Sequence, residues 1–205
     1  MKIRPEDLEA EGYTLIDKLD HSELIPFVKK NLNKWSYISI FFYSINLILL
    51  LAGILSIYIS FTYKNAEIGD VVFHYCFGFT ICFLLIPIHE YIHVLAYRYL
   101  GAKETSFDYN LKKFYFMALA NNFVANRREF AFVALFPFTL ISFFLFILYF
   151  YADNNWQITL LSTLFLHTAM CSGDFGLLNF FYINKNKNVV TYDDTTNKIS
   201  FFYIK

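Results

Sequence analysis

Charged residues are scarce in this chain, and neither sign prevails. Asp, Glu, Lys and Arg make up 17 % of the 205 residues, with 17 basic and 17 acidic side chains. Soluble domains carry about 25 % charged residues. A net charge of zero argues against a nucleic-acid partner, because binding nucleic acid needs an excess of basic residues. The apolar fraction of 57 % is instead typical of an integral membrane protein.

Cysteine is also rare. The chain has three cysteines and no C-x-x-C pair, and all three lie in apolar segments: Cys76, Cys82 and Cys171. We therefore expect reduced packing residues and no disulfide framework. The first 20 residues are polar and lack the apolar centre of a signal peptide, so we expect no cleavage there.

Long apolar runs are the dominant feature that the sequence does have. Four segments could cross a bilayer, which takes about 20 helical residues. They cover approximately residues 35–63, 68–100, 130–151 and 156–171. The sequence thus predicts an all-α polytopic membrane protein with about four transmembrane helices.

The distribution of basic residues predicts how these spans are oriented. Sixteen of the 17 Lys and Arg residues fall on one side of a four-span arrangement, and Lys64 is the exception. Basic loops stay in the cytoplasm, so this side, with both termini, is expected to be cytoplasmic. The many Phe, Ile, Asn, Lys and Tyr residues indicate an AT-rich bacterial genome, so a bacterial inner membrane is expected.

The segments outside the spans complete the expected organisation. Residues 1–34 should form a cytoplasmic segment, with helical spacing of apolar residues between Pro5 and Lys34 that predicts an amphipathic helix on the membrane surface. Residues 35–182 should form the transmembrane domain, and residues 183–205 a cytoplasmic tail containing a β-hairpin. The stretch Phe107–Phe116 alternates aromatic and polar residues, which predicts a second hairpin at the membrane edge.

An H-E-x-x-H pentad lies near the end of the second apolar run. His89 and His93 are four residues apart, so on a helix they face the same side and can share a Zn²⁺ ion. Glu90 has the position of the general base that acts on water in zinc peptidases. Ionisable groups are costly in hydrocarbon, so three of them inside an apolar run indicate a functional site.

A catalytic zinc needs a third protein ligand and an open position for water. Asp174 is expected at the same membrane depth as the pentad, at the cytoplasmic end of the fourth span, which Ser172-Gly173-Asp174 ends or interrupts. His167 lies about two turns deeper on the same helix face and is the alternative ligand, or a residue that supports a ligand. His74 is about four turns from His89, too far to coordinate the same ion. His21 is expected to face solvent, and Asp108 and Asp153 to be loop acids.

The pentad at the inner end of a span, followed by a later intramembrane Asp after a Gly, resembles the site-2 protease group of intramembrane zinc proteases. The chain looks most like a family of small four-span bacterial membrane proteins described as zincin peptidases. The likeness covers approximately residues 35–182. It implies that His89, His93 and Asp174 bind zinc and that Glu90 is catalytic.

The sequence therefore predicts an intramembrane zinc metalloendopeptidase that hydrolyses peptide bonds of membrane-associated or transmembrane substrates. The expected cofactor is Zn²⁺, and the expected partners are the lipid bilayer and a peptide or transmembrane-helix substrate. Two alternatives stay open at this point. One is a non-catalytic membrane protein that binds metal for structure or sensing, with a closed site of four protein ligands. The other, less favoured because no inverted repeat is visible, is a small transporter.

Overall fold

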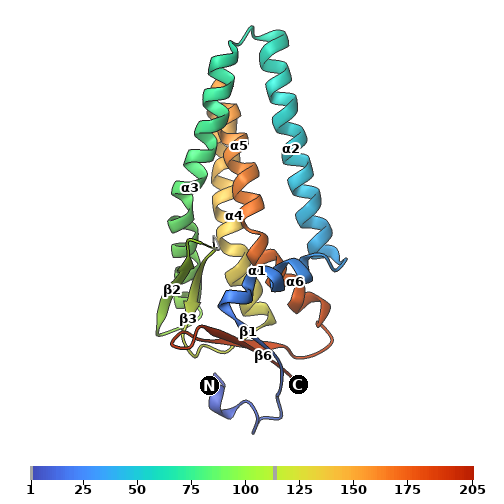
Figure 1. Cartoon of the computed structure of the whole chain (residues 1–205), viewed down its shortest axis with the longest axis vertical. Coiled ribbons are helices and arrows are strands. Elements are labelled where there is room, and N and C mark those ends of the chain that lie inside the picture. The colour runs from blue at the N-terminus through green and yellow to red at the C-terminus, as the bar shows by residue number, and fades with distance from the viewer. Residues whose placement is uncertain (1, 113–114) are drawn as a thin grey trace. The chain divides into compact units, whose positions relative to one another are not determined.

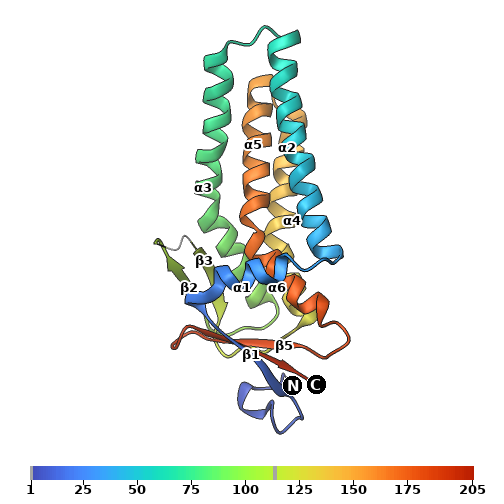
Figure 2. The same ribbon diagram turned by 45° about the vertical axis from the view of Figure 1, so that its right-hand side comes forward.

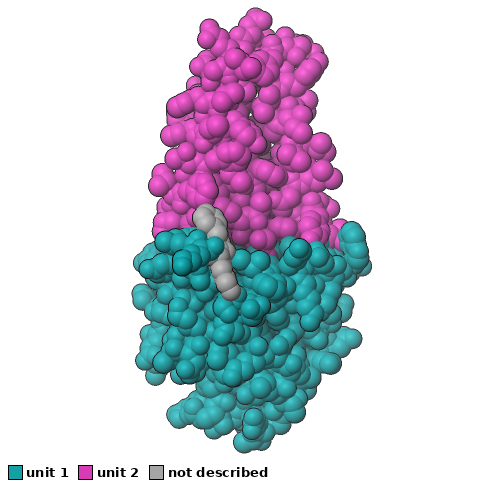
Figure 3. All heavy atoms as spheres, in the orientation of Figure 1, with its two compact units in different colours: residues 1–39, 90–137, 173–205 teal, residues 40–89, 138–172 magenta. Residues whose placement is uncertain are grey.

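The computed structural model describes residues 2–112 and 115–205 and divides into two compact units (Figure 3). One unit contains residues 40–89 and 138–172 and is called the helical unit below. The other contains residues 1–39, 90–137 and 173–205 and is called the mixed unit, because it holds both strands and helices. The chain passes between the units several times, so neither is one continuous stretch of sequence.

The helical unit is built from parts of four long helices that run alongside one another (Figure 1). Their bounds are α2 Tyr37–Tyr63, α3 Ile68–Tyr99, α4 Arg127–Tyr151 and α5 Asn154–Met170. Each predicted span is thus a helix, within a few residues of its predicted ends. Asp153 caps α5, since its side chain accepts a hydrogen bond from the Trp156 amide at 3.2 Å. Asp153 is therefore a helix cap as well as the loop acid that was expected.

Among the described residues, three helices are long and apolar enough to cross a membrane: α2, α3 and α4. These helices indicate a membrane protein. The fourth predicted span corresponds to α5, which has 17 residues and is not one of the three. The count of four spans and the cytoplasmic position of the termini stay predictions.

Small and hydroxyl side chains let α3 and α5 approach closely. A Cβ atom on Gly78 would lie 1.9 Å from Ser162 Oγ and 2.5 Å from the Thr159 carbonyl oxygen, so only glycine fits. The Thr163 hydroxyl donates to the Gly78 carbonyl at 3.1 Å, and Thr159 Oγ1 bonds the His74 ring at 2.9 Å. Close backbone approach with interhelical hydrogen bonds is how helices associate in lipid, where no hydrophobic driving force acts between them.

The mixed unit contains a four-stranded sheet with strand order β1-β6-β5-β4. The strands are β1 Thr14–Asp20, β4 Ala125–Asn126, β5 Val190–Asp194 and β6 Ile199–Ile204, and neighbouring strands are antiparallel. Short 3-10 helices, η1 Pro5–Asp7 and η2 His21–Glu23, precede and follow β1. The hairpin of β5 and β6 confirms the hairpin predicted in the tail.

Two helices of the mixed unit, α1 Leu24–Leu32 and α6 Ser172–Ile183, lie side by side in both ribbon views (Figure 2). The Asn179 side chain on α6 donates to the Asn31 carbonyl of α1 at 2.8 Å. Gly176 lies directly against Val28, where an added Cβ would be 2.7 Å from Val28 Cγ1. Aromatic rings complete this core, with Phe180 and Phe202 centroids 4.9 Å apart.

A second hairpin, β2 Thr105–Asn110 and β3 Tyr115–Ala120, forms a separate two-stranded sheet. It confirms the hairpin predicted around Phe107–Phe116, of which residues 113 and 114 lie outside the described residues. Phe107 and Tyr109 on β2 are both more than half exposed.

The structure corrects the expectation for residues 5–34. Only α1 has the predicted helical form, whereas Leu15, Ile16 and Leu19 lie on strand β1. The reason is long-range pairing: β1 bonds along β6, nearly 190 residues later, and this register satisfies its backbone groups. The expected all-α class is therefore too narrow, because the fold is mostly helical but includes a small β-sheet. The division into residues 1–34, 35–182 and 183–205 stays a prediction about boundaries along the chain.

Candidate metal centre

The pentad lies on the last part of α3. This helix runs without a break from Ile68 to Tyr99 and ends at Gly101, whose φ of 96° is readily adopted only by glycine. His89, Glu90 and His93 come from a single turn, and each offers a ligand atom within 4.8 Å of the others. The local geometry expected for H-E-x-x-H on a helix is present.

Within the mixed unit, the hydrogen bonds of His93 define the role of each ring nitrogen. Nδ1 is 2.9 Å from the Val133 carbonyl oxygen on α4, and a carbonyl can only accept, so Nδ1 carries the proton. In a neutral ring Nε2 then holds the lone pair, and this atom faces Asp174 Oδ1 at 3.2 Å. A backbone carbonyl on one ring nitrogen and a ligand position on the other is the usual arrangement of a zinc-binding histidine.

Asp174 is in the first turn of α6. Helix α5 ends at Met170 and α6 begins at Ser172, so the predicted interruption is observed at the predicted place. The first turn of a helix favours a negative charge because its amide groups point outward there. The Asp174 side chain is 18 % exposed, which leaves it accessible on one side.

The spacing of the His93 and Asp174 atoms fits a shared zinc ion. Two ligands at the usual Zn–N and Zn–O distances and a tetrahedral angle lie about 3.4 Å apart, close to the 3.2 Å observed. A lone pair and a carboxylate oxygen also repel each other unless a cation or a proton lies between them. Nitrogen and oxygen donors together are the ligands that catalytic zinc prefers.

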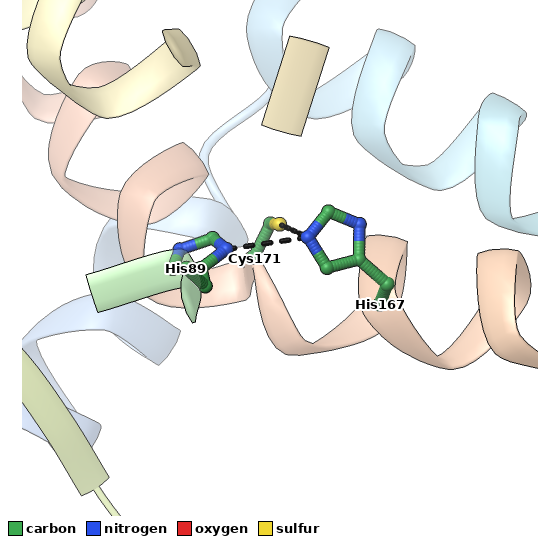
Figure 4. Close-up of side chains that lie close together, drawn as sticks. All are labelled: His89, His167 and Cys171. Carbon is green, nitrogen blue, oxygen red and sulfur yellow. Dashed lines mark hydrogen bonds between the residues drawn. The ribbon is translucent and has the colours of Figure 1, made fainter. Parts of the chain in front are cut away.

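Within the helical unit, His89 belongs to a second group of donors (Figure 4). His89 Nδ1 is 3.2 Å from His167 Nε2, and Cys171 Sγ is 4.0 Å from the same His167 atom. His167 is thus adjacent to a pentad histidine, as one of its predicted roles requires. Cys171 was expected to be a packing residue only. The sequence signal that could have identified it is its position four residues after His167, at the C-cap of α5.

Other residues considered from the sequence lie elsewhere. His74, which was expected to be too far along α3 from the pentad to coordinate the same ion, bonds Thr159. His21 was expected in solvent but is only 1 % exposed, and its Nδ1 is 3.0 Å from Asp108 Oδ2. Asp108 is not a loop acid: it lies on β2 and also accepts hydrogen bonds from Lys198 and Tyr115. This buried network belongs to the mixed unit and joins the β2–β3 hairpin to β6 and η2.

The pKa values of two acids in the mixed unit are shifted in opposite directions. Burial alone would raise the pKa of Asp108, but hydrogen bonds from Lys198 and His21 and their charges outweigh it and hold this pKa below its ordinary value. Burial raises the pKa of Asp193, and the hydrogen bond from Ser200 only partly offsets it. Ser200 Oγ lies 3.3 Å from His21 Nε2 and 2.7 Å from Asp193 Oδ1, so the His21 ring and the Ser200 hydroxyl together link the two acids.

Two apolar cavities of the helical unit lie beside α2 and are not lined by the candidate ligands. The larger, about 350 Å³, is lined by α2, α4 and α5 together with Lys64, and the smaller, about 80 Å³, by α2, α3 and α5. Their linings carry none of the pentad residues. Neither of these two cavities marks the metal-binding chemistry, and we take the donor chemistry as the indicator of function.

Comparison with known proteins agrees with the donor chemistry. The chain matches no curated protein and no solved structure in these comparisons. Residues 82–190 match the model of a family described as "Putative zincin peptidase". The matched region includes the pentad, His167, Cys171 and Asp174. Because the match covers more than half of the chain, this protein belongs to that zinc metallopeptidase family.

Proposed function

We propose that the protein is an intramembrane zinc metalloendopeptidase of the site-2 protease type. The observation that carries this proposal is the state of His93: Nδ1 donates to Val133 and Nε2 faces Asp174 Oδ1 at 3.2 Å. His89, one turn earlier on the same continuous helix, is proposed as the other nitrogen ligand. The three ligands would be His89, His93 and Asp174, leaving one tetrahedral position open.

The protein's own groups would supply the proton transfers. A zinc ion bound there would act as a Lewis acid toward water and toward the peptide carbonyl. Glu90 follows His89 directly on α3, so its carboxylate is available to take a proton from the attacking water and deliver it to the leaving amine nitrogen. The Val133 carbonyl holds the His93 ring in one orientation and one tautomer.

The proposed substrates are membrane-associated peptides or transmembrane helices. A helix has its backbone hydrogen bonds satisfied internally, so a substrate must unwind before its carbonyl can react. The β2–β3 hairpin is our candidate for receiving the unwound segment, because its sheet order gives β2 only β3 as a neighbour among the described strands. Exposed Phe107 and Tyr109 on β2 would contact the substrate's side chains.

We place the protein in a bacterial inner membrane, and the basic-residue distribution supports four spans with both termini in the cytoplasm. In that orientation the pentad end of α3 faces the cytoplasm, which would supply water. Cysteine accessibility mapping with membrane-impermeant reagents at positions 33, 65, 153 and 187 tests this orientation. Labelling of 65 and 153 from the periplasm alone supports it, and periplasmic labelling of 33 or 187 contradicts it.

The decisive experiment combines metal analysis with a peptidase assay on the full chain in detergent or proteoliposomes. We expect Glu90→Gln to keep its zinc but to lose activity on an unstructured fluorogenic peptide by about 10² to 10⁴-fold. His93→Ala and Asp174→Ala should lose both zinc and activity. His74→Ala, on the same helix but bonded to Thr159, is the matched control and should keep both.

Full zinc occupancy in both ligand variants would refute the site. An active Glu90→Gln protein would refute the mechanism and leave the site standing.

One observation favours a second candidate function, a non-catalytic metal site for structure or sensing: His167 and Cys171 lie beside His89 and could add ligands. This alternative would be favoured if the protein has no peptidase activity and loses its zinc when His167 or Cys171 is substituted.

A further inference from the structure

Three metal-ligating side chains of the helical unit converge between α3 and α5 (Figure 4). They are His89, His167 and Cys171, and each offers a ligand atom within 4.8 Å of the other two. His167 and Cys171 are 2 % and 0 % exposed. Two imidazoles and a thiol form a donor set suited to Zn²⁺ and to softer cations such as Cd²⁺, and poorly suited to Mg²⁺ or Ca²⁺.

The other cysteines of the unit show that this convergence is specific. Cys82 is also buried, but its Sγ is 3.2 Å from Met170 Sδ and belongs to no group of donors among the described residues. Cys76 is exposed. Cys171 has an imidazole nitrogen beside its sulfur, because its position four residues after His167 places both side chains on the same side at the C-terminal end of α5.

We propose that His89 Nδ1, His167 Nε2 and Cys171 Sγ form a second metal position, which takes a borderline or soft divalent cation. Binding displaces the thiol proton of Cys171 to solvent, since the thiolate is the ligand form. The position shares His89 with the zinc site of the proposed function, but it does not depend on peptidase activity.

Because both positions use His89, an ion bound at the second position affects the ion bound at the first. A neutral imidazole has one lone-pair nitrogen, so it serves one cation at a time unless it loses its second proton. A cation held through Nδ1 therefore leaves the other ion with only His93 and Asp174 as protein ligands. We expect excess Zn²⁺ or Cd²⁺ to inhibit the peptidase by taking His89 away from the catalytic ion.

Cobalt is the probe that tests this position, because thiolate ligation gives Co²⁺ a charge-transfer band in the near ultraviolet. The full chain carrying Cys76→Ser and Cys82→Ser, with Cys171 as its single thiol, is titrated with Co²⁺ after metal removal. We expect binding to exceed one ion per chain and a thiolate band to appear. Cys82→Ser alone is the matched control and should keep the band.

Variants then separate this position from the proposed catalytic site. Cys171→Ser should abolish the band and leave one bound ion, and His167→Ala should weaken the second ion by about tenfold or more. Cys171→Ala repeats the test in case the serine variant does not fold. His93→Ala and Asp174→Ala should remove the other ion and leave the thiolate band.

Two results would overturn the proposal: a single bound ion with no thiolate band in the single-cysteine protein, or a band that survives Cys171→Ser. Either would leave the proposed zinc peptidase site intact. If the only bound ion depends on Cys171 and His167 but not on His93 and Asp174, the second position is supported. The ligand set of the proposed function is then wrong.

Discussion

The two compact units stabilise their buried polar groups in different ways. In the helical unit, hydroxyl groups bond backbone carbonyls: Thr163 Oγ1 contacts the Gly78 oxygen at 3.1 Å and the Thr159 oxygen at 2.8 Å. In the mixed unit, charged groups bond one another, with Asp108 accepting from His21 and Lys198. Charged groups are costly in hydrocarbon, whereas hydroxyl groups bonded to backbone carbonyls are tolerated there, so the polar groups of the helical unit are of the kind that apolar helices such as α2 can carry.

The candidate metal chemistry is divided in the same way. The mixed unit supplies the pair His93–Asp174, and the helical unit supplies His89, His167 and Cys171. Charge is found in the first group and soft, neutral donors in the second. This contrast predicts which substitutions affect a hard nitrogen–oxygen site and which affect a site with sulfur.

The largest effect should separate these two groups of donors. We expect Asp174→Ala to weaken the tightest zinc site by more than about 100-fold, because it removes a proposed direct ligand. His167→Ala should weaken it by about tenfold, since it removes only a partner of His89. Competition with a chromophoric chelator measures both affinities. The reverse order would mean that the helical unit holds the main zinc site.

The next effect concerns packing between α3 and α5. Gly78→Ala should destabilise the protein by about 1–3 kcal/mol, because its Cβ would overlap Ser162 Oγ and the Thr159 carbonyl. Gly53→Ala on α2 is the matched control: no atom lies within 4 Å of its added Cβ, so helix propensity should make it neutral or stabilising by up to about 1 kcal/mol. Unfolding in mixed detergent measures both. Equal destabilisation would contradict the packing of Gly78 against α5.

A smaller and pH-dependent effect should appear in the mixed unit. The lowered pKa of Asp108 means that its ionised form is favoured by folding. This stabilisation is fully present above the ordinary carboxyl pKa, about 3.9, and is lost as the pH falls through the lowered value. Asp108→Asn should cost about 1.5–3 kcal/mol at pH 7 and much less in acid, because it removes a charged acceptor of Lys198 and His21.

Hydrogen exchange of the β2–β3 hairpin between pH 7 and pH 3 measures the Asp108 effect. Glu11→Gln, at an exposed position, is the control and should change nothing. If Asp108→Asn destabilises the hairpin equally at both pH values, then the geometry of the hydrogen bonds, and not the charge of the carboxylate, stabilises this network.

The smallest effect should come from a single hydroxyl in the helical unit. Thr163→Val should cost about 0.6 kcal/mol, the usual value of an interhelical hydrogen bond in a membrane. Thr80→Val on the exposed face of α3 is the control, since its hydroxyl bonds only the Cys76 carbonyl of its own helix, at 3.3 Å. The same unfolding assay compares the two, and a larger loss at Thr80 would contradict the assigned role of Thr163.

Several features followed from the sequence because they depend on neighbouring residues. Apolar runs placed α2 to α5 within a few residues, and helical spacing placed His89 and His93 on one face. The interruption before Asp174 was visible in Ser172 and Gly173. The β5–β6 hairpin was also local, since its two strands are joined by a short polar turn.

Other features depended on contacts between distant residues, and the sequence did not reveal them. Strand β1 forms because it pairs with β6 along its length. The helical spacing of its apolar residues had predicted a helix instead of a strand. His21 is buried because Asp108 and Ser200 bond both of its ring nitrogens. Cys171 became a candidate ligand only when α5 brought it beside His167, and α3 brought His89 to the same place.

The sequence by itself determined the apolar helices and the pentad, because both are set by residues within a turn or two of one another. Tertiary structure decided which nitrogen of His93 faces Asp174, which partners bury His21, and which donors lie beside His89. The physical reason is that side-chain roles in a site depend on hydrogen-bond partners from other elements. Local spacing does not specify those partners.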